Sequence, residues 1–167
     1  MTETTTTTDP TADDAPVTTT VHGAAELLAT AGSELGRSAW MEITQDRIDT
    51  FADATDDHQW IHCDAERAAD GPFGSTIAHG YLTLSLVVPL IEEILVIEGK
   101  TTSVNYGLDK VRFPAPVPVG SRIRMLATMA EATEITGGVQ VVIDTTVERA
   151  GGDRPVCVAR IVLRHLF

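Results

Sequence analysis

The sequence predicts an α+β domain in which an antiparallel sheet curls over a buried helix. The first observation behind this prediction is an uncharged segment, residues 71–91, which contains no Asp, Glu, Lys or Arg. The second is a run of strand-like stretches in the last third of the chain, separated by turns rich in Gly and Pro. The third is length, because 167 residues suffice for one domain that buries about two-thirds of its unfolded surface.

The first half of the chain predicts short helices around one strand. "HGAAELLATAG" indicates an amphipathic helix that ends at Gly32, and "GRSAWMEIT" indicates a strand. "TQDRIDTFADATDD" begins with a capping residue, Thr44, and places its apolar residues at helical spacing. Residues 56–64 follow as a predicted loop. "DAERAAD" then predicts a short helix with Asp64 as its N-cap and Gly71 as its stop.

The uncharged segment predicts the buried helix. A helix from about His79 to about Gly99 would be apolar almost all round, so the rest of the domain must wrap it. Pro89 should kink this helix because proline lacks the backbone N–H. The Gly and Pro residues of segment 71–91 argue against a membrane span, which needs about 20 predominantly apolar residues.

Four stretches of the last third predict the wrapping sheet. In the second and third of these stretches, apolar and polar residues alternate, so that one face of each predicted strand is apolar. The stretches are "SVNYGLDKVRF", "SRIRMLATMAEA", "GVQVVIDTTVERA" and "RPVCVARIVLRHLF". The apolar faces of the middle two comprise Ile123, Met125, Ala127 and Met129, and Val139, Val141, Ile143 and Val147.

Composition divides the chain and limits its partners. Residues 1–20 hold ten Thr and four acidic residues, which predicts a disordered Thr-rich acidic tail before a single domain at residues 21–167. The net charge of −12 argues against nucleic acid and anionic membranes as partners. The N-terminus has no signal-peptide pattern, and Cys63 and Cys157 have no paired spacing, so a cytoplasmic location is expected.

The stretch "DDHQWIHCD", residues 56–64, contains the candidate catalytic residues of the chain. Asp57 and His62 can hold one water between them, and Trp60 and Ile61 would form an apolar surface beside it that excludes bulk water. The alternative is that these residues are solvated charges of a surface loop without a catalytic role. His58 and His62 are spaced for metal binding only on a helix, so no metal is expected. His79 is expected to cap or pack at the start of the buried helix rather than to do chemistry.

Three motifs in this order resemble the MaoC-like dehydratases of the hot-dog fold, most closely the bacterial single-domain (R)-specific enoyl-CoA hydratases. The motifs are "DDHQWIH", "PFGSTIAHGYLTLSL" and "YGLDKVRFPAPVPVGSRI". The resemblance runs from about His22 to the C-terminus. It implies a hot-dog fold, with an antiparallel sheet wrapped around a long central helix.

The resemblance also implies roles for individual residues. Asp57 and His62 fill the catalytic positions, and Gln59, Trp60 and Ile61 fill the places between them that position the substrate. Gly80, at the start of the buried helix, would bind the thioester oxygen through its backbone N–H. This sequence departs from the family pattern at two positions. The residue before the catalytic acid is commonly Gly, but here it is Asp56. A helix hydroxyl of some members is replaced by Val88, so Ser85 is the nearest substitute.

The activity so implied is reversible hydration of trans-2-enoyl-CoA to (3R)-3-hydroxyacyl-CoA. No cofactor is expected, since coenzyme A is part of the substrate, and a homodimer is expected because one hot-dog unit leaves a sheet edge exposed. The alternatives are an acyl-CoA thioesterase on the same fold and a non-catalytic acyl-CoA-binding subunit. Basic residues 110, 112, 122 and 124 either meet the coenzyme phosphates or are solvated strand faces. Acyl length and the residue that moves the α-proton stay open.

Overall fold

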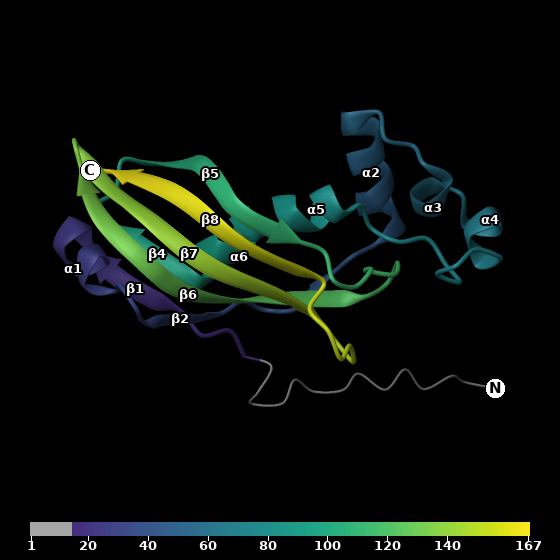
Figure 1. The fold of residues 1–167 in the computed structure, drawn as a ribbon, viewed down its shortest axis with the longest axis horizontal. Helices are drawn as coiled ribbons and strands as arrows, with labels where there is room; N and C mark the ends of the chain where they lie inside the picture. The colour runs from purple at the N-terminus through teal and green to yellow at the C-terminus, as the bar shows by residue number, and fades with distance from the viewer. Residues whose placement is uncertain (1–14) are drawn as a thin grey trace, which may run out of the picture.

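The computed structural model describes residues 15–167. One curved sheet lies over the helices α5 and α6, and the helices α2, α3 and α4 sit together beyond one end of the sheet (Figure 1). The C-terminus lies at the opposite end of the sheet (Figure 1). This arrangement confirms the predicted α+β fold with an antiparallel sheet over a buried helix.

The main sheet has six strands, and its neighbouring strands run β2-β6-β7-β8-β5, with β3 paired to β6 as well. All pairings in it are antiparallel. The strands are β2 Glu34–Arg37, β3 Met41–Glu42, β5 Thr102–Arg112, β6 Arg122–Ile135, β7 Gly138–Arg149 and β8 Cys157–Leu166. Among residues 15–167, strand β5 pairs only with β8, so its other edge has no partner strand in this part of the chain.

The core lies between this sheet and α6. The alternating residues predicted for β6 and β7 are all buried, among them Met125, Met129 and Ile143, which are fully buried. They meet Leu90 and Ile94 of α6, which are also fully buried. Burying one such side chain stabilises the fold by about 1.5–3 kcal/mol, so this cluster holds the helix on the sheet.

The buried helix is shorter than predicted and is divided. It consists of α5, Gly80–Ser85, and α6, Val87–Ile94, with Leu86 between them. Pro89 explains the division, because it has no N–H to donate to the carbonyl of Ser85 one turn earlier. The helix stops at Ile94 rather than near Gly99, since the chain continues as the strand β4, Leu95–Glu98.

Strand β4 pairs in parallel with β1, Thr19–His22. The main chain of Val17 also bridges to Arg37, and the Thr19 hydroxyl donates to the Leu35 carbonyl at 2.6 Å. The prediction of a disordered tail is therefore wrong for residues 17–20, which belong to the domain. The first fourteen residues of the predicted tail lie outside the described residues.

The helices of the first half follow the local signals. They are α1 Gly23–Ala29, α2 Gln45–Thr55 and α4 Ala65–Ala69. Thr44 caps α2 by accepting from the Arg47 N–H at 3.3 Å, and Asp64 caps α4 by accepting from the Arg67 N–H at 3.0 Å. Within residues 15–167, no helix is long and apolar enough to cross a membrane.

Two details differ from the predictions for this half. The predicted loop contains a one-turn helix, α3, at Trp60–Cys63. The predicted strand "GRSAWMEIT" is interrupted between β2 and β3. The interruption is held by Ser38, whose N–H donates to the Met125 carbonyl at 2.9 Å while its hydroxyl accepts from the Met125 N–H at 3.0 Å.

Candidate active site

Asp57 stands in the bend between α2 and α3. The residue before it, Asp56, ends α2 in the left-handed backbone conformation, with φ of 58°. This conformation turns the chain sharply, and glycine adopts it without the steric cost that a side chain brings. The Asp57 side chain is 54% exposed, so water reaches its carboxylate freely.

His62 lies on α3 and is only 6% exposed. Its Nδ1 lies 2.7 Å from the Ile77 carbonyl oxygen, and a carbonyl accepts, so Nδ1 carries the proton of the neutral ring. Nε2 is then the acceptor nitrogen. The Gln45 side-chain amide donates to the His62 carbonyl at 2.8 Å, and the Ile77 N–H donates to the Ile61 carbonyl at 3.0 Å. These bonds fix the ring in one orientation.

His79, which the sequence assigned to capping or packing, is part of the same site. It precedes α5, makes no side-chain capping bond and is 2% exposed. Its Nε2 donates to the Asp57 backbone carbonyl at 2.9 Å, and its ring stacks on His62 with centroids 3.7 Å apart. The ring of Phe51 packs against His79 at 5.0 Å. The predicted packing is confirmed, and the partners are the two predicted catalytic residues.

The three side chains bring their polar atoms into one small cluster. A carboxylate oxygen of Asp57 and a ring nitrogen of each of His62 and His79 all lie within 4.8 Å of one another. Atoms this far apart can be bridged through one water. Burial lowers the pKa of His62, and His79 lowers it further, while the bond to Ile77 and the charge of Asp57 oppose the shift. The ring is therefore a neutral base at pH 7.

These three residues also form a set that could hold a metal ion. The pair proposed from spacing is not brought together, because His58 lies against Asp53, with Nε2 2.9 Å from a carboxylate oxygen. The absence of a metal stays a prediction. Burial and the nearby acids Asp49, Asp53 and Asp57 raise the pKa of the Cys63 thiol, which disfavours a nucleophilic role for it.

Gly80 is the first residue of α5, where a backbone N–H has no carbonyl in a preceding helical turn. A Cβ at this position would lie 3.0 Å from the Phe113 ring, so a side chain would press on that ring. A hollow of about 270 Å³ opens beside Gly80 and is lined by Phe73, Ile77 and Phe113, among others.

A second hollow, the helix groove, begins at the next residue. It holds about 340 Å³ between the helices α5 and α6 and the strands β5 and β8. Ser85 lies in it, but its hydroxyl donates to the Tyr81 carbonyl at 2.7 Å. The remaining lining is mainly apolar: Tyr81, Leu84, Val87, Val88, Ile91, Tyr106, Leu108, Ile161 and Leu163.

The residues predicted between the acid and the histidine lie on α3 or at its start. Gln59 is exposed, and its carbonyl accepts from the His62 N–H at 2.9 Å. Ile61 is half-buried. The Trp60 ring packs under the Arg67 guanidinium at 4.5 Å and against Gly71. The aromatic ring that packs against the histidine pair is instead that of Phe51, which sequence reasoning missed, as it missed Gln45.

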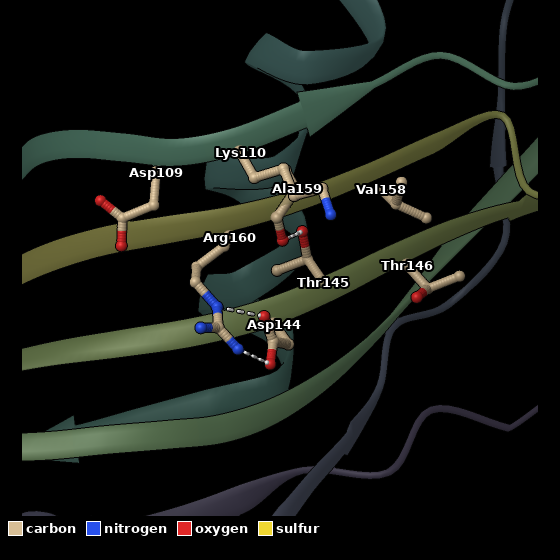
Figure 2. A pocket seen from close by; sticks show the side chains of 8 residues that line it. All are labelled: Asp109, Lys110, Asp144, Thr145, Thr146, Val158, Ala159 and Arg160. Carbon is tan, nitrogen blue, oxygen red and sulfur yellow. Dashed lines mark hydrogen bonds and ion pairs between the residues drawn. The ribbon is translucent and has the colours of Figure 1, made fainter.

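A hollow of about 560 Å³ lies on the outer face of the sheet, opposite the helices (Figure 2). Two of its charged residues are paired with each other, since Arg160 donates twice to Asp144 at 2.7 Å (Figure 2). Lys110 also lines it, on β5. Of the other basic residues, Arg122 and Arg124 lie on β6, three strands away, and stack over Trp40. The structure thus divides the basic residues that the sequence grouped.

Comparison with known proteins agrees with this geometry. The protein-family model described as "MaoC like domain" matches residues 26–150. The 3-hydroxyacyl-thioester dehydratase Z of Mycobacterium tuberculosis (strain H37Rv) is 49% identical over 148 residues, which cover 88% of this chain and 98% of that protein. Nodulation protein N of Rhizobium leguminosarum is 45% identical over 139 residues, which cover 81% of this chain and 86% of that protein.

Solved structures confirm the predicted hot-dog fold. The R-hydratase PhaJ1 from Pseudomonas aeruginosa superposes with a TM-score of 0.67 at 24% identity, covering 86% of this chain and 85% of that one. The (R)-hydratase from A. caviae gives a TM-score of 0.65 at 21% identity, covering 80% and 94%. The fold, the motif order and the match over most of the sequence lead to one conclusion: the chain is a member of the MaoC-like domain family.

Proposed function

We propose that the protein is an (R)-specific enoyl-CoA hydratase, which adds water reversibly to trans-2-enoyl-CoA and so also acts as a (3R)-3-hydroxyacyl-CoA dehydratase. The observation that carries the proposal is the buried, neutral His62, which lies with Asp57 and His79 in one cluster whose polar atoms are within 4.8 Å of one another. The similarity to a 3-hydroxyacyl-thioester dehydratase supports the same reaction class.

In the proposed reaction, Asp57 and His62 hold the water between them. Its oxygen bonds to C3 of the enoyl group while the π electrons move through C2 onto the thioester oxygen. The water gives one proton to the Asp57–His62 pair and keeps the other as the product hydroxyl. The pair then returns a proton to C2, and the thioester carbonyl forms again. Acid–base catalysis of this kind contributes about 10²–10⁴ in rate.

The Gly80 N–H would stabilise the negative charge that develops on the thioester oxygen. Because this N–H is fixed by the helix, it needs no reorganisation when the charge develops. The thioester oxygen at Gly80 directs the acyl chain toward the neighbouring helix groove, whose apolar lining suits a hydrocarbon chain. Ser85 would contact the chain in this groove.

The proposed assembly is a homodimer formed along β5. This strand has eleven residues and one edge that no other described strand pairs with, and apolar side chains such as Val104, Tyr106 and Leu108 are about half exposed on it. Free edges of this length favour pairing with another strand. A second copy joined there would extend the sheet and cover the open side of the helix groove.

Crotonyl-CoA separates the proposal from its alternatives in one assay. Loss of the enoyl absorbance without release of free thiol supports hydration, and a chiral analysis of the product should give the 3R alcohol. Release of free thiol would indicate the thioesterase, and binding without turnover would indicate the non-catalytic subunit. Activity that persists in EDTA supports the prediction that no metal takes part.

A further inference from the structure

The Gln45 side chain joins three segments that meet around His62. Gln45 is the first residue of α2, and its amide nitrogen donates to the His62 carbonyl at 2.8 Å and to the Asp49 carboxylate at 2.7 Å. Its amide oxygen accepts from the Thr76 hydroxyl at 2.6 Å. The amide therefore bonds to α2 itself, to α3 and to the segment that leads into α5.

The partners of Gln45 fix how its amide is turned. A carbonyl and a carboxylate can only accept, so the NH2 group must face His62 and Asp49. The amide oxygen then faces Thr76, whose hydroxyl can donate. Thr76 is 2% exposed, so water does not compete for this hydroxyl. Glutamate has the same shape, but it would turn an oxygen toward two acceptors.

Gln45 ties together the two ends of the hydrogen bond that orients the His62 ring. The ring donates from Nδ1 to the Ile77 carbonyl at 2.7 Å, and Ile77 directly follows Thr76. The Gln45 amide holds the His62 backbone on one side and Thr76 on the other. The Val119 N–H donates to the Thr76 carbonyl at 2.9 Å, which holds Thr76 from the opposite direction. Gln45 therefore limits how far the ring can separate from the carbonyl.

We propose that Gln45 is a positioning residue for the hydration reaction, which keeps the proton of the neutral His62 ring on Nδ1 and leaves Nε2 as the nitrogen that accepts a proton. The inference rests on the proposed function, because it assumes that His62 acts as a base. Gln45 lines neither the hollow beside Gly80 nor the helix groove. Loss of its contacts should therefore lower kcat and leave KM for crotonyl-CoA within about twofold.

Gln45→Met tests the inference, because methionine is close to glutamine in length and helix propensity but has no N–H. The kcat for crotonyl-CoA should fall by about 10–100-fold, the range expected when a reacting group is misplaced. Nitrogen NMR of the His62 ring gives a second readout. The wild-type ring should show the Nδ1–H tautomer alone, and the ring in Gln45→Met should show both tautomers.

Thr76→Val removes the same contact from its other end, because valine has the shape of threonine without the hydroxyl. Its kcat should fall as well, and the double variant should lose no more than Gln45→Met alone, since both changes break one shared contact. If Gln45→Met does not fold, Gln45→Asn takes its place, because the shorter amide cannot reach both His62 and Thr76.

Two control variants leave the network intact. Arg47→Met introduces the same side chain at an exposed position in the same turn of α2. Thr145→Val removes a buried hydroxyl of β7, which donates to the Ala159 carbonyl away from the site. Both variants should keep the wild-type kcat and the single tautomer of His62.

Each outcome decides between the possibilities. Failure of the wild-type protein to hydrate crotonyl-CoA would overturn the proposed function, and the tautomer measurement would still decide whether Gln45 holds the ring. A wild-type kcat in Gln45→Met, or a lowered kcat with the ring in its single tautomer, would overturn the inference. An equal loss in Arg47→Met would assign the effect to the stability of α2. Losses that multiply in the double variant would show that Gln45 and Thr76 act separately, against the inference.

Discussion

The ring of His62 stacks on the ring of His79, with their centroids 3.7 Å apart and their planes inclined by 27°. Both rings are almost completely buried. A proton added to His62 would place a positive charge away from water and beside a second imidazole, so burial first, and His79 to a smaller extent, lower the pKa of His62. Burial and the stack therefore keep His62 in the form that can accept a proton.

The first prediction concerns the pH dependence of hydration. The active form of His62 is the neutral ring, and its pKa in the folded protein lies below the ordinary value. Activity should therefore persist as the pH falls to about 6.5 and decline only below it. The measurement is kcat/KM for crotonyl-CoA across pH, with His22→Gln as a control for an exposed histidine. An acid limb centred above pH 6.5 would contradict the assignment.

The second prediction concerns the catalytic pair. Asp57→Asn and His62→Gln should each lower kcat by about 10²–10⁴, because each variant lacks the group that exchanges a proton with water. Asp57 is exposed, so its amide variant should keep the wild-type melting temperature. His62 is buried, so glutamine is preferred to alanine, which would leave a cavity. Near wild-type turnover by either variant would remove that residue from the mechanism.

The third prediction concerns Gly80. A Cβ added there lies 3.0 Å from the Phe113 ring, which lines the same hollow, so Gly80→Ala should crowd the proposed thioester position and lose most activity. Phe113 is 41% exposed and can move, so the loss of stability should be within about 1–3 kcal/mol. The double variant Gly80→Ala with Phe113→Leu should regain stability but not turnover. Recovery of both would mean that the N–H contact is not needed.

Local signals in the sequence predicted the elements whose partners lie close in the chain. Thr44 and Asp64 cap helices as expected because each bonds an N–H three residues on. The role of His79 could not be predicted, since its partners Asp57 and His62 lie about twenty residues earlier and meet it only through the fold. The same holds for Thr19, which pairs in parallel with Leu95, far along the chain.

The fourth prediction concerns Asp56, whose φ of 58° disfavours side chains branched at Cβ. Asp56→Val should lower the free energy of unfolding by about 1–2 kcal/mol, whereas Asp56→Gly and Asp56→Asn should keep or raise it. Urea unfolding measures the difference. Ala54→Val is the control for a side chain branched at Cβ, because Ala54 is also exposed but helical, and its change should stay below about 1 kcal/mol. Equal losses at both positions would show that the left-handed backbone is not the cause.

The fifth prediction concerns assembly along β5. A two-fold pairing centred on the middle of this strand, Gly107, brings Leu108 close to its own copy in the partner. Leu108→Glu would then place two like charges together at the interface, and the protein should become monomeric at micromolar concentration in light scattering. Leu126→Glu is the matched control, because Leu126 on β6 is similarly exposed, at 38% against 49%, but lies away from this edge. A wild-type monomer, or a dimer that survives Leu108→Glu but not Leu126→Glu, would place the interface elsewhere.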